Sequence, residues 1–177
     1  VTALLDSFAP ATLLEDAEDH ADRADGLRTM DARVTRLAED LANELTDINR
    51  DLVVAIVRES YAGLVRSVRL TQHMIPLTER FARQRLADLA RTPDSAVPQV
   101  LFVCVANAGR SQLAAALLNK LSAGTVIARS AGSTPAADVH PNVRKLLAEI
   151  EAPALADAAF PKPLTDDAVR AADVVIT

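Results

Sequence analysis

The sequence predicts two parts: an all-α helical bundle, followed by an α/β domain built on a doubly wound parallel sheet. Three observations lead to this division. Apolar residues recur at helical spacing from residue 34 onward, and a short run rich in β-branched residues begins at Val100. Between them, residues 91–98 hold two prolines and small polar side chains, which is typical of a linker. We therefore place a domain boundary after residue 95, with a helical bundle over 1–95 and an α/β domain over 96–177.

Three helices are expected in the first half, besides one short helix within residues 1–31. The first of the three has an apolar stripe typical of an amphipathic helix, formed by Val34, Leu37, Leu41, Leu45 and Ile48. A broader stripe over residues 52–68 predicts the second. The third begins near Pro76, because proline is favoured in the first turn of a helix.

The second half alternates between strands and helices. Strands are predicted at residues 100–105, 125–128 and 172–177, and helices at residues 111–121 and 140–150. This order favours parallel strands that are joined by right-handed crossovers. Since the third strand stands at the end of the sequence, we expect the sheet to be truncated at the C-terminus, with further strands past residue 177.

Composition limits the classes of protein that fit. Half of the 177 residues are apolar, which is enough for a packed core. Aromatic residues make up 3% and the net charge is −5, so the sequence favours no nucleic-acid partner. No apolar run approaches the length of a membrane span, and no signal-peptide pattern opens the sequence. We therefore expect a cytoplasmic protein with no membrane partner.

One segment carries the residue types of a reactive site: Cys104-Val-Ala-Asn-Ala-Gly-Arg110-Ser111. It joins the first predicted strand to the next helix, where backbone N–H groups and the helix N-terminus can bind an anion. Cys104 would be a nucleophilic thiolate, because this positive field lowers the pKa of its thiol. Arg110 would bind a tetrahedral oxyanion through paired hydrogen bonds, and Ser111 would donate its hydroxyl to the thiolate.

The residues between Cys104 and Arg110 are expected to bind the oxyanion through their backbone. They are Val105, Ala106, Asn107, Ala108 and Gly109. Gly109 would let the backbone pass close to the anion, and Asn107 would hold a positive φ angle or brace the loop with its amide. A lone cysteine at a strand end is more often a buried hydrophobe, but Arg110 six positions later reverses that expectation. The three histidines share no metal-ligand spacing, so no metal site is expected.

This strand, loop and helix resemble the low-molecular-weight tyrosine phosphatase superfamily, over roughly residues 98–177. Arg110-Ser-Gln112 is more similar to the thioredoxin- and mycothiol-type arsenate reductases, because the phosphatases usually carry proline where this chain has Gln112. Three further stretches match the reductase branch: residues 129–135, 140–147 and 160–177. The helical half resembles, more weakly, a bundle that precedes this domain in some actinobacterial proteins.

The resemblance implies that Cys104 attacks the arsenic of arsenate while the loop amides and Arg110 hold the arsenate oxygens. A further thiol would then reduce the arsenic–sulfur adduct and release arsenite. Thioredoxin-coupled members use two additional cysteines of the same chain, whereas this sequence has Cys104 alone. We therefore expect no bound cofactor and an external thiol as reductant: mycothiol, glutathione or a redoxin. Alternatively, resolving cysteines lie past Thr177, together with the family's general-acid aspartate.

Two other functions stay open at this point. A low-molecular-weight protein tyrosine phosphatase would use Cys104 and Arg110 through a phosphocysteine intermediate, and that chemistry needs no second thiol. Alternatively, the chain binds oxyanions or partners without catalysis, and its helical half is the working part. Because that half combines acidic residues with long apolar stripes, we also expect a homodimer through residues 33–91.

Overall fold

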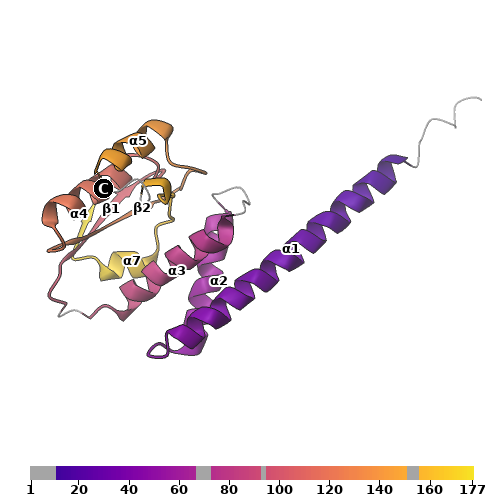
Figure 1. Ribbon diagram of the computed structural model, residues 1–177, viewed down its shortest axis with the longest axis horizontal. Helices are drawn as coiled ribbons and strands as arrows, with labels where there is room; N and C mark the ends of the chain where they lie inside the picture. Colours follow the sequence, from indigo (N-terminus) through magenta and orange to yellow (C-terminus); the bar gives the residue numbers. More distant parts are fainter. Residues whose placement is uncertain (1–10, 67–72, 93–94, 151–155) are drawn as a thin grey trace, which may run out of the picture.

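The computed structural model describes residues 11–66, 73–92, 95–150 and 156–177. Its helices and strands are α1 (Ala11–Glu44), α2 (Arg50–Val65), α3 (Met74–Ala90), β1 (Gln99–Cys104), α4 (Arg110–Ser122), β2 (Ile127–Gly132), α5 (Pro141–Ile150), α7 (Asp166–Ala171) and β3 (Val174–Ile176). Figure 1 shows a helical part beside an α/β part, with α3 lying next to α7.

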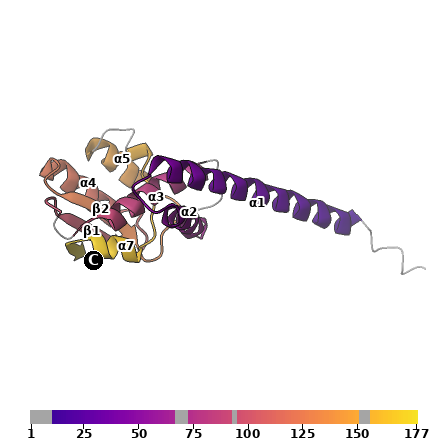
Figure 2. The same cartoon turned by 90° about the horizontal axis from the view of Figure 1, so that it is seen from below.

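The first helix differs from the prediction. The sequence predicts a short separate helix within residues 1–31, and this prediction is wrong, because one helix runs unbroken from Ala11 to Glu44. No proline interrupts it, and the single glycine within it, Gly26, costs only about 1 kcal/mol of helix stability and does not end it. At 1.5 Å per residue α1 is about 50 Å long, and its N-terminal part projects beyond α2 and α3 (Figure 2). Residues 1–10 lie outside the described residues.

The apolar stripes of the three helices meet in one core, as their spacing predicts. The buried members of this core are Val34, Leu37, Ala38, Leu41, Ala42, Val53, Ile56, Val57, Ala82 and Leu86. Ile48 packs against the core from the turn after α1 rather than from the helix itself. Asn49 caps α2, because its side-chain oxygen accepts the N–H of Leu52 at 3.1 Å. The end of the second predicted stripe, within residues 67–72, lies outside the described residues.

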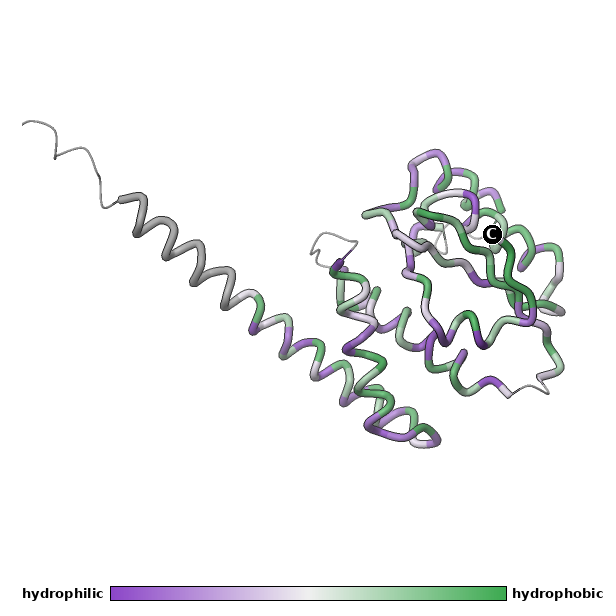
Figure 3. The backbone as a smooth tube through the Cα atoms, turned by 180° about the vertical axis from the view of Figure 1, so that it is seen from behind, coloured by the Kyte–Doolittle hydropathy of each residue, from purple (hydrophilic) through white to green (hydrophobic). Residues whose placement is uncertain are grey.

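The second half contains a three-stranded parallel sheet in the order β2-β1-β3. From β1 the chain passes through α4 to β2, and it then returns through α5 and α7 to β3 on the other side of β1. Helices α4 and α5 pack together, whereas α7 packs on β1 and on α3, so the sheet is doubly wound, as predicted. Figure 3 shows hydrophobic residues along the strands between these helices.

Two elements of the α/β half differ from the prediction. The second strand is β2, at Ile127–Gly132, and not residues 125–128. Polar side chains interrupt the apolar pattern of this strand in the sequence. One of them, Arg129, forms an ion pair at 3.1 Å with Asp88 of α3, which is distant in the sequence. The short helix α7 is absent from the prediction, and its buried Asp167 likewise has a distant partner, Arg85.

Helix α3 joins the two halves through ion pairs and apolar contacts. Its buried Arg85 pairs with Asp167 at 2.9 Å and reaches Glu59 of α2 at 3.0 Å. Nearer the sheet, Asp88 accepts a hydrogen bond from the side chain of Gln99 at 3.0 Å. One apolar cluster draws residues from both halves: Leu64, Met74, Phe81 and Phe160. The helical half therefore packs against α7 and the amino end of β1.

Candidate active site

Cys104 ends the central strand of the sheet, and α4 begins six residues later at Arg110. The loop between them thus lies at the carboxyl end of β1, where ligands of open α/β sheets usually bind. Cys104, Arg110 and Ser111 line one side of a cavity of about 250 Å³, which Phe102 and Ile176 also border. The structure therefore brings together the three residues that the sequence predicts as reactive.

The carbonyl groups of the loop all have partners outside it. The oxygens of Cys104, Val105, Ala106 and Ala108 accept the N–H groups of Ser133, Thr134, Ala136 and His140 at 2.9–3.1 Å, and that of Asn107 accepts the Gln112 side chain at 3.1 Å. The loop peptides are trans, so each following N–H points away from these partners. Each N–H of the five residues predicted to bind an oxyanion, 105–109, thus points away from the bonded partner of the carbonyl before it. One of them, the N–H of Asn107, donates to the Cys104 sulfur at 3.2 Å.

A second hydrogen bond joins the Cys104 thiol to Ser111. The sulfur lies 3.0 Å from the serine hydroxyl, and either group can be the donor; that hydroxyl also accepts the side-chain amide of Asn107 at 2.8 Å. A thiolate can only accept, so in that form of Cys104 the Ser111 hydroxyl is the donor, as the sequence predicts for the reactive state.

Opposing effects act on the acidity of this thiol. Burial raises the pKa of Cys104, whereas the hydroxyl and backbone N–H of Ser111, the N–H of Asn107 and the charge of Arg110 lower it. The lowering effects win, so the pKa of Cys104 lies below the ordinary value of 9.0. The site thus favours a thiolate, the form in which cysteine is a nucleophile.

Asn107 has both features that the sequence predicts for it. Its φ angle is +46°, in the left-handed region where asparagine is tolerated, and it is fully buried. Its side-chain oxygen accepts the N–H of Lys162 at 2.8 Å and the amide of Gln112 at 3.1 Å, while its NH₂ group donates to Ser111. Asn107 therefore ties the loop to two other parts of the α/β half.

Gly132 is a site residue that the sequence does not reveal. It pairs with Cys104 in the β1–β2 register. A Cβ there would lie 2.7 Å from the carbonyl oxygen of Val105 and 2.9 Å from the backbone nitrogen of Asn107, too close for any side chain. At Gly109, by contrast, a Cβ would meet only Val143 and His140, at 3.7 and 3.9 Å. The protein's own packing thus requires glycine at 132 and not at 109.

Gln112 gains a physical role that its position in the sequence alone does not indicate. Its buried side-chain nitrogen lies within hydrogen-bond distance of the Asn107 carbonyl and side-chain oxygens, both at 3.1 Å, and of the Phe160 carbonyl at 2.8 Å. A proline at this position has no such donor. Since Phe160 is 48 residues away, no local pattern reveals this contact.

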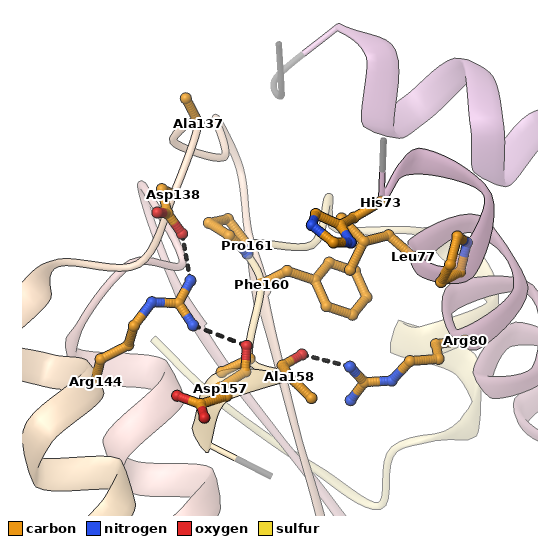
Figure 4. A pocket seen from close by; sticks show the side chains of 12 residues that line it. His73, Leu77, Arg80, Ala137, Asp138, Arg144, Asp157, Ala158, Phe160 and Pro161 are labelled. Atoms are coloured by element: carbon orange, nitrogen blue, oxygen red, sulfur yellow. Dashed lines mark hydrogen bonds and ion pairs between the residues drawn. The ribbon is translucent and has the colours of Figure 1, made fainter. Parts of the chain in front are cut away.

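A larger cavity lies elsewhere. It measures about 550 Å³ and lies between α3 and residues 157–161 (Figure 4). None of residues 104–111 lines it, so its size does not make it the reaction site. Within the part of the chain that the structure describes, no three His, Cys, Asp or Glu side chains gather as metal ligands. The helices in that same part include none that is long and apolar enough to cross a membrane.

Comparisons with known proteins agree on the class of this site. The family model described as low molecular weight phosphotyrosine protein phosphatase matches residues 99–177, and the one described as protein-tyrosine-phosphatase-like, N-terminal domain, matches residues 34–90. A solved structure of the Corynebacterium glutamicum thioredoxin-dependent arsenate reductase Cg_ArsC1' is 43% identical, with a TM-score of 0.72. The match covers 81% of this chain and 73% of that one.

Proposed function

The chain belongs to the low-molecular-weight phosphotyrosine protein phosphatase family, in its arsenate reductase branch, and we propose that it is an enzyme that reduces arsenate to arsenite. The observation that carries this proposal is the convergence at Cys104. Its sulfur lies 3.0 Å from the Ser111 hydroxyl and accepts the N–H of Asn107, at the start of a loop whose carbonyl groups are bonded to other parts of the chain. The relative of known structure, described as a thioredoxin-dependent arsenate reductase, supports arsenate as the substrate.

In the first step, arsenate binds with its oxygens on the N–H groups of residues 105–109 and on the guanidinium of Arg110. Arg110 suits this role because it is exposed, lines the same cavity as Cys104 and takes part in no ion pair found among the described residues. The Cys104 thiolate attacks arsenic and forms a sulfur–arsenic bond. One arsenic–oxygen bond breaks, and that oxygen leaves as water once it is protonated.

In the second step, an external thiol attacks the sulfur of Cys104. The sulfur–arsenic bond breaks and its electron pair stays on arsenic, which leaves as arsenite. Cys104 and the external thiol are then joined in a mixed disulfide, and a further thiol reduces it by exchange. Two thiols are thus oxidised to one disulfide for each arsenate reduced. We favour a redoxin as this external donor, since the relative of known structure is thioredoxin-dependent, with mycothiol and glutathione as alternatives.

The other functional properties follow from this chemistry. A reaction that consumes reduced thiols suits the reducing cytoplasm, which is where we place the protein. We retain a domain boundary after residue 95, supported by the separate family matches to 34–90 and 99–177.

We also retain a homodimer through residues 33–91. Because the apolar stripe of α1 is buried within the chain, pairing would use other faces of the helices, such as that of the exposed Leu52. Light scattering tests this proposal, and a protein that stays monomeric at high concentration would contradict it.

Arsenate-dependent oxidation of a thiol donor tests the function. Reduced thioredoxin, mycothiol and glutathione are supplied separately to the full-length protein, beside a Cys104→Ser variant. We expect turnover with at least one donor, and a loss of about a thousandfold or more in the variant, as for other enzymes that lose their nucleophile. No arsenate-dependent oxidation with any donor would overturn the proposal. Release of phosphate from an aryl phosphate in that case would identify the phosphatase alternative.

A further inference from the structure

A second, polar cavity lies between the helical half and the α/β half. It measures about 400 Å³ and is bordered by α3, α4, β2 and residues 159–162. We call it the interface cavity. Cys104, Arg110 and Ser111 do not line it, so it is separate from the site described above. It also differs from the larger cavity of Figure 4, although Arg80 and Ala159 border both.

The charges around the interface cavity have one sign. Its lining contains three cationic side chains, those of Arg80, Arg129 and Lys162, and three carboxamides, those of Gln84, Gln112 and Asn119. No Asp or Glu is among the described residues that line it. One of the three cations, Arg129, forms an ion pair at 3.1 Å with Asp88, which does not line the interface cavity. The lining thus carries an excess of positive charge, which focuses the potential inside a partly enclosed space.

Two of these cations contact the same aromatic ring. The guanidinium carbon of Arg80 lies 5.4 Å from the centre of the Phe160 ring, and the ammonium nitrogen of Lys162 lies 5.0 Å from it. Figure 4 shows Arg80 next to this ring, where it also donates to the carbonyl of Ala158. Cation–π contact favours a defined position for each cation, so two of the positive charges that line the interface cavity are held beside Phe160.

Arg129 adds a donor with no partner. Its Nε–H is buried and has no hydrogen-bond acceptor among the described residues, although its terminal nitrogen pairs with Asp88. A buried donor without an acceptor costs about 1–3 kcal/mol in general. An oxyanion in the interface cavity could accept from such guanidinium donors, whereas a neutral apolar ligand could not.

We propose that the interface cavity binds a small molecule that carries a phosphate- or sulfate-type dianion. A tetrahedral dianion matches the cationic groups in sign and accepts several hydrogen bonds at once. The volume leaves room for an organic portion beside the dianion. This site does not depend on the reaction at Cys104. It adjoins the loop, however, because the backbone of Lys162 and the side chain of Gln112 both bond to Asn107. The position suits an effector rather than the substrate.

Calorimetric titration with inorganic sulfate tests the proposal, in an Arg110→Ala background that weakens anion binding at the loop. We expect one sulfate to bind in this background. Adding Lys162→Gln or Arg80→Gln should each weaken that binding at least tenfold. Adding Lys120→Gln removes the same charge from a lysine outside the cavity and should leave it unchanged. Thermal unfolding identifies any variant that fails to fold. If Lys162→Gln fails to fold, the Arg80→Gln variant, whose substitution lies on α3, provides the test instead.

Two results would overturn the proposal. One is loss of all sulfate binding in the Arg110→Ala background, since every anion would then bind at the loop. The other is equal binding by the Lys162→Gln, Arg80→Gln and Lys120→Gln variants. A parallel titration with glycerol phosphate identifies the source of the dianion. Tighter binding than sulfate assigns the cavity to an organic phosphate, and equal affinity assigns it to a free oxyanion.

Discussion

Two acidic groups near opposite ends of strand β1, the half-buried Cys104 thiol and the buried Asp88 carboxyl of α3, respond differently to their surroundings. Burial raises the pKa of both the Cys104 thiol and the Asp88 carboxyl. At Cys104, hydrogen bonds from Ser111 and Asn107 together with the charge of Arg110 outweigh burial, and the pKa falls. At Asp88, Arg129 and Gln99 do not outweigh it, and the pKa rises. One Asp88 oxygen is indeed buried without a hydrogen bond among the described residues.

This difference reflects two kinds of interaction that stabilise the two ends of the sheet. The carboxyl end is held by neutral donors, namely backbone N–H groups of residues 133–140 and the amides of Asn107 and Gln112. The amino end and α7 are held by ion pairs from α3 and the residue after it, as in Arg85–Asp167 and Arg91–Asp173. A carboxylate next to Cys104 would oppose its ionisation, so the separation preserves the thiolate. Variants at one end should therefore change stability, and variants at the other should change thiol reactivity.

The largest effect on stability is expected from Asp167→Ala. This change leaves Arg85 buried with only Glu59 as a partner, and breaking a buried ion pair generally costs about 3–5 kcal/mol. Urea unfolding should show this loss, while alkylation of Cys104 in the folded protein should keep its rate. Glu44→Ala, which breaks the exposed pair with Arg83, is the control and should change stability little. Equal effects of the two changes would contradict the role given to the buried pair.

A smaller loss, of both stability and reactivity, is expected from Gly132→Ala. The new methyl group would displace the backbone of Val105 and Asn107, and forced contacts of this kind cost about 1–3 kcal/mol. Both the urea midpoint and the rate of Cys104 alkylation should fall. Gly109→Ala introduces the same group where its nearest contact is 3.7 Å, so it should have less effect on stability. If the two variants were equally stable, the close approach at Gly132 would be wrong.

Ser111→Ala should alter the thiol with little effect on the fold. Removal of the hydroxyl takes away a donor that favours the thiolate, so the pKa of Cys104 should rise. Hydrogen bonds to charged groups contribute about 1.5–3 kcal/mol, and we expect alkylation by iodoacetamide at pH 7 to slow by about tenfold. The difference should vanish at a pH above both thiol pKa values, where both proteins are ionised. Ser111→Thr keeps the hydroxyl and should resemble wild type. An unchanged pH dependence of alkylation in Ser111→Ala would show that Ser111 does not act on the Cys104 thiol.

The smallest effect concerns Asp88 and the pH dependence of stability. Because its folded-state pKa is raised, the folded protein binds a proton more tightly than the unfolded chain does. Asp88 thus favours folding most at a pH below its ordinary value of 3.8, and this contribution is lost as the pH rises through the folded-state pKa. Urea unfolding at several pH values should show a weaker decline over this range in Asp88→Asn. An identical decline in both proteins would contradict the raised pKa.

The sequence reveals the site where its contacts are local. Cys104, Asn107, Arg110 and Ser111 lie within eight residues, so their types and spacing were sufficient to predict that they lie together and that Asn107 braces the loop. Gly132 and the partners of Gln112 could not be predicted, because their contacts connect residues from different elements. The same reason explains the errors in the fold. Strand β2 contains Arg129, whose partner Asp88 lies on helix α3. For helix α1, no local signal in the sequence shows that it is one continuous helix.

Alkylation of Cys104 with and without arsenate tests the central claim most directly, since Cys104 is the single cysteine of this sequence. The rate is measured as a function of pH in wild type and in Arg110→Ala. We predict that the wild-type rate reaches half its maximum below the ordinary thiol pKa of 9.0, and that arsenate protects the thiol in wild type much more than in the variant. A midpoint at the ordinary value, with no protection by arsenate, would contradict an oxyanion site built around a Cys104 thiolate.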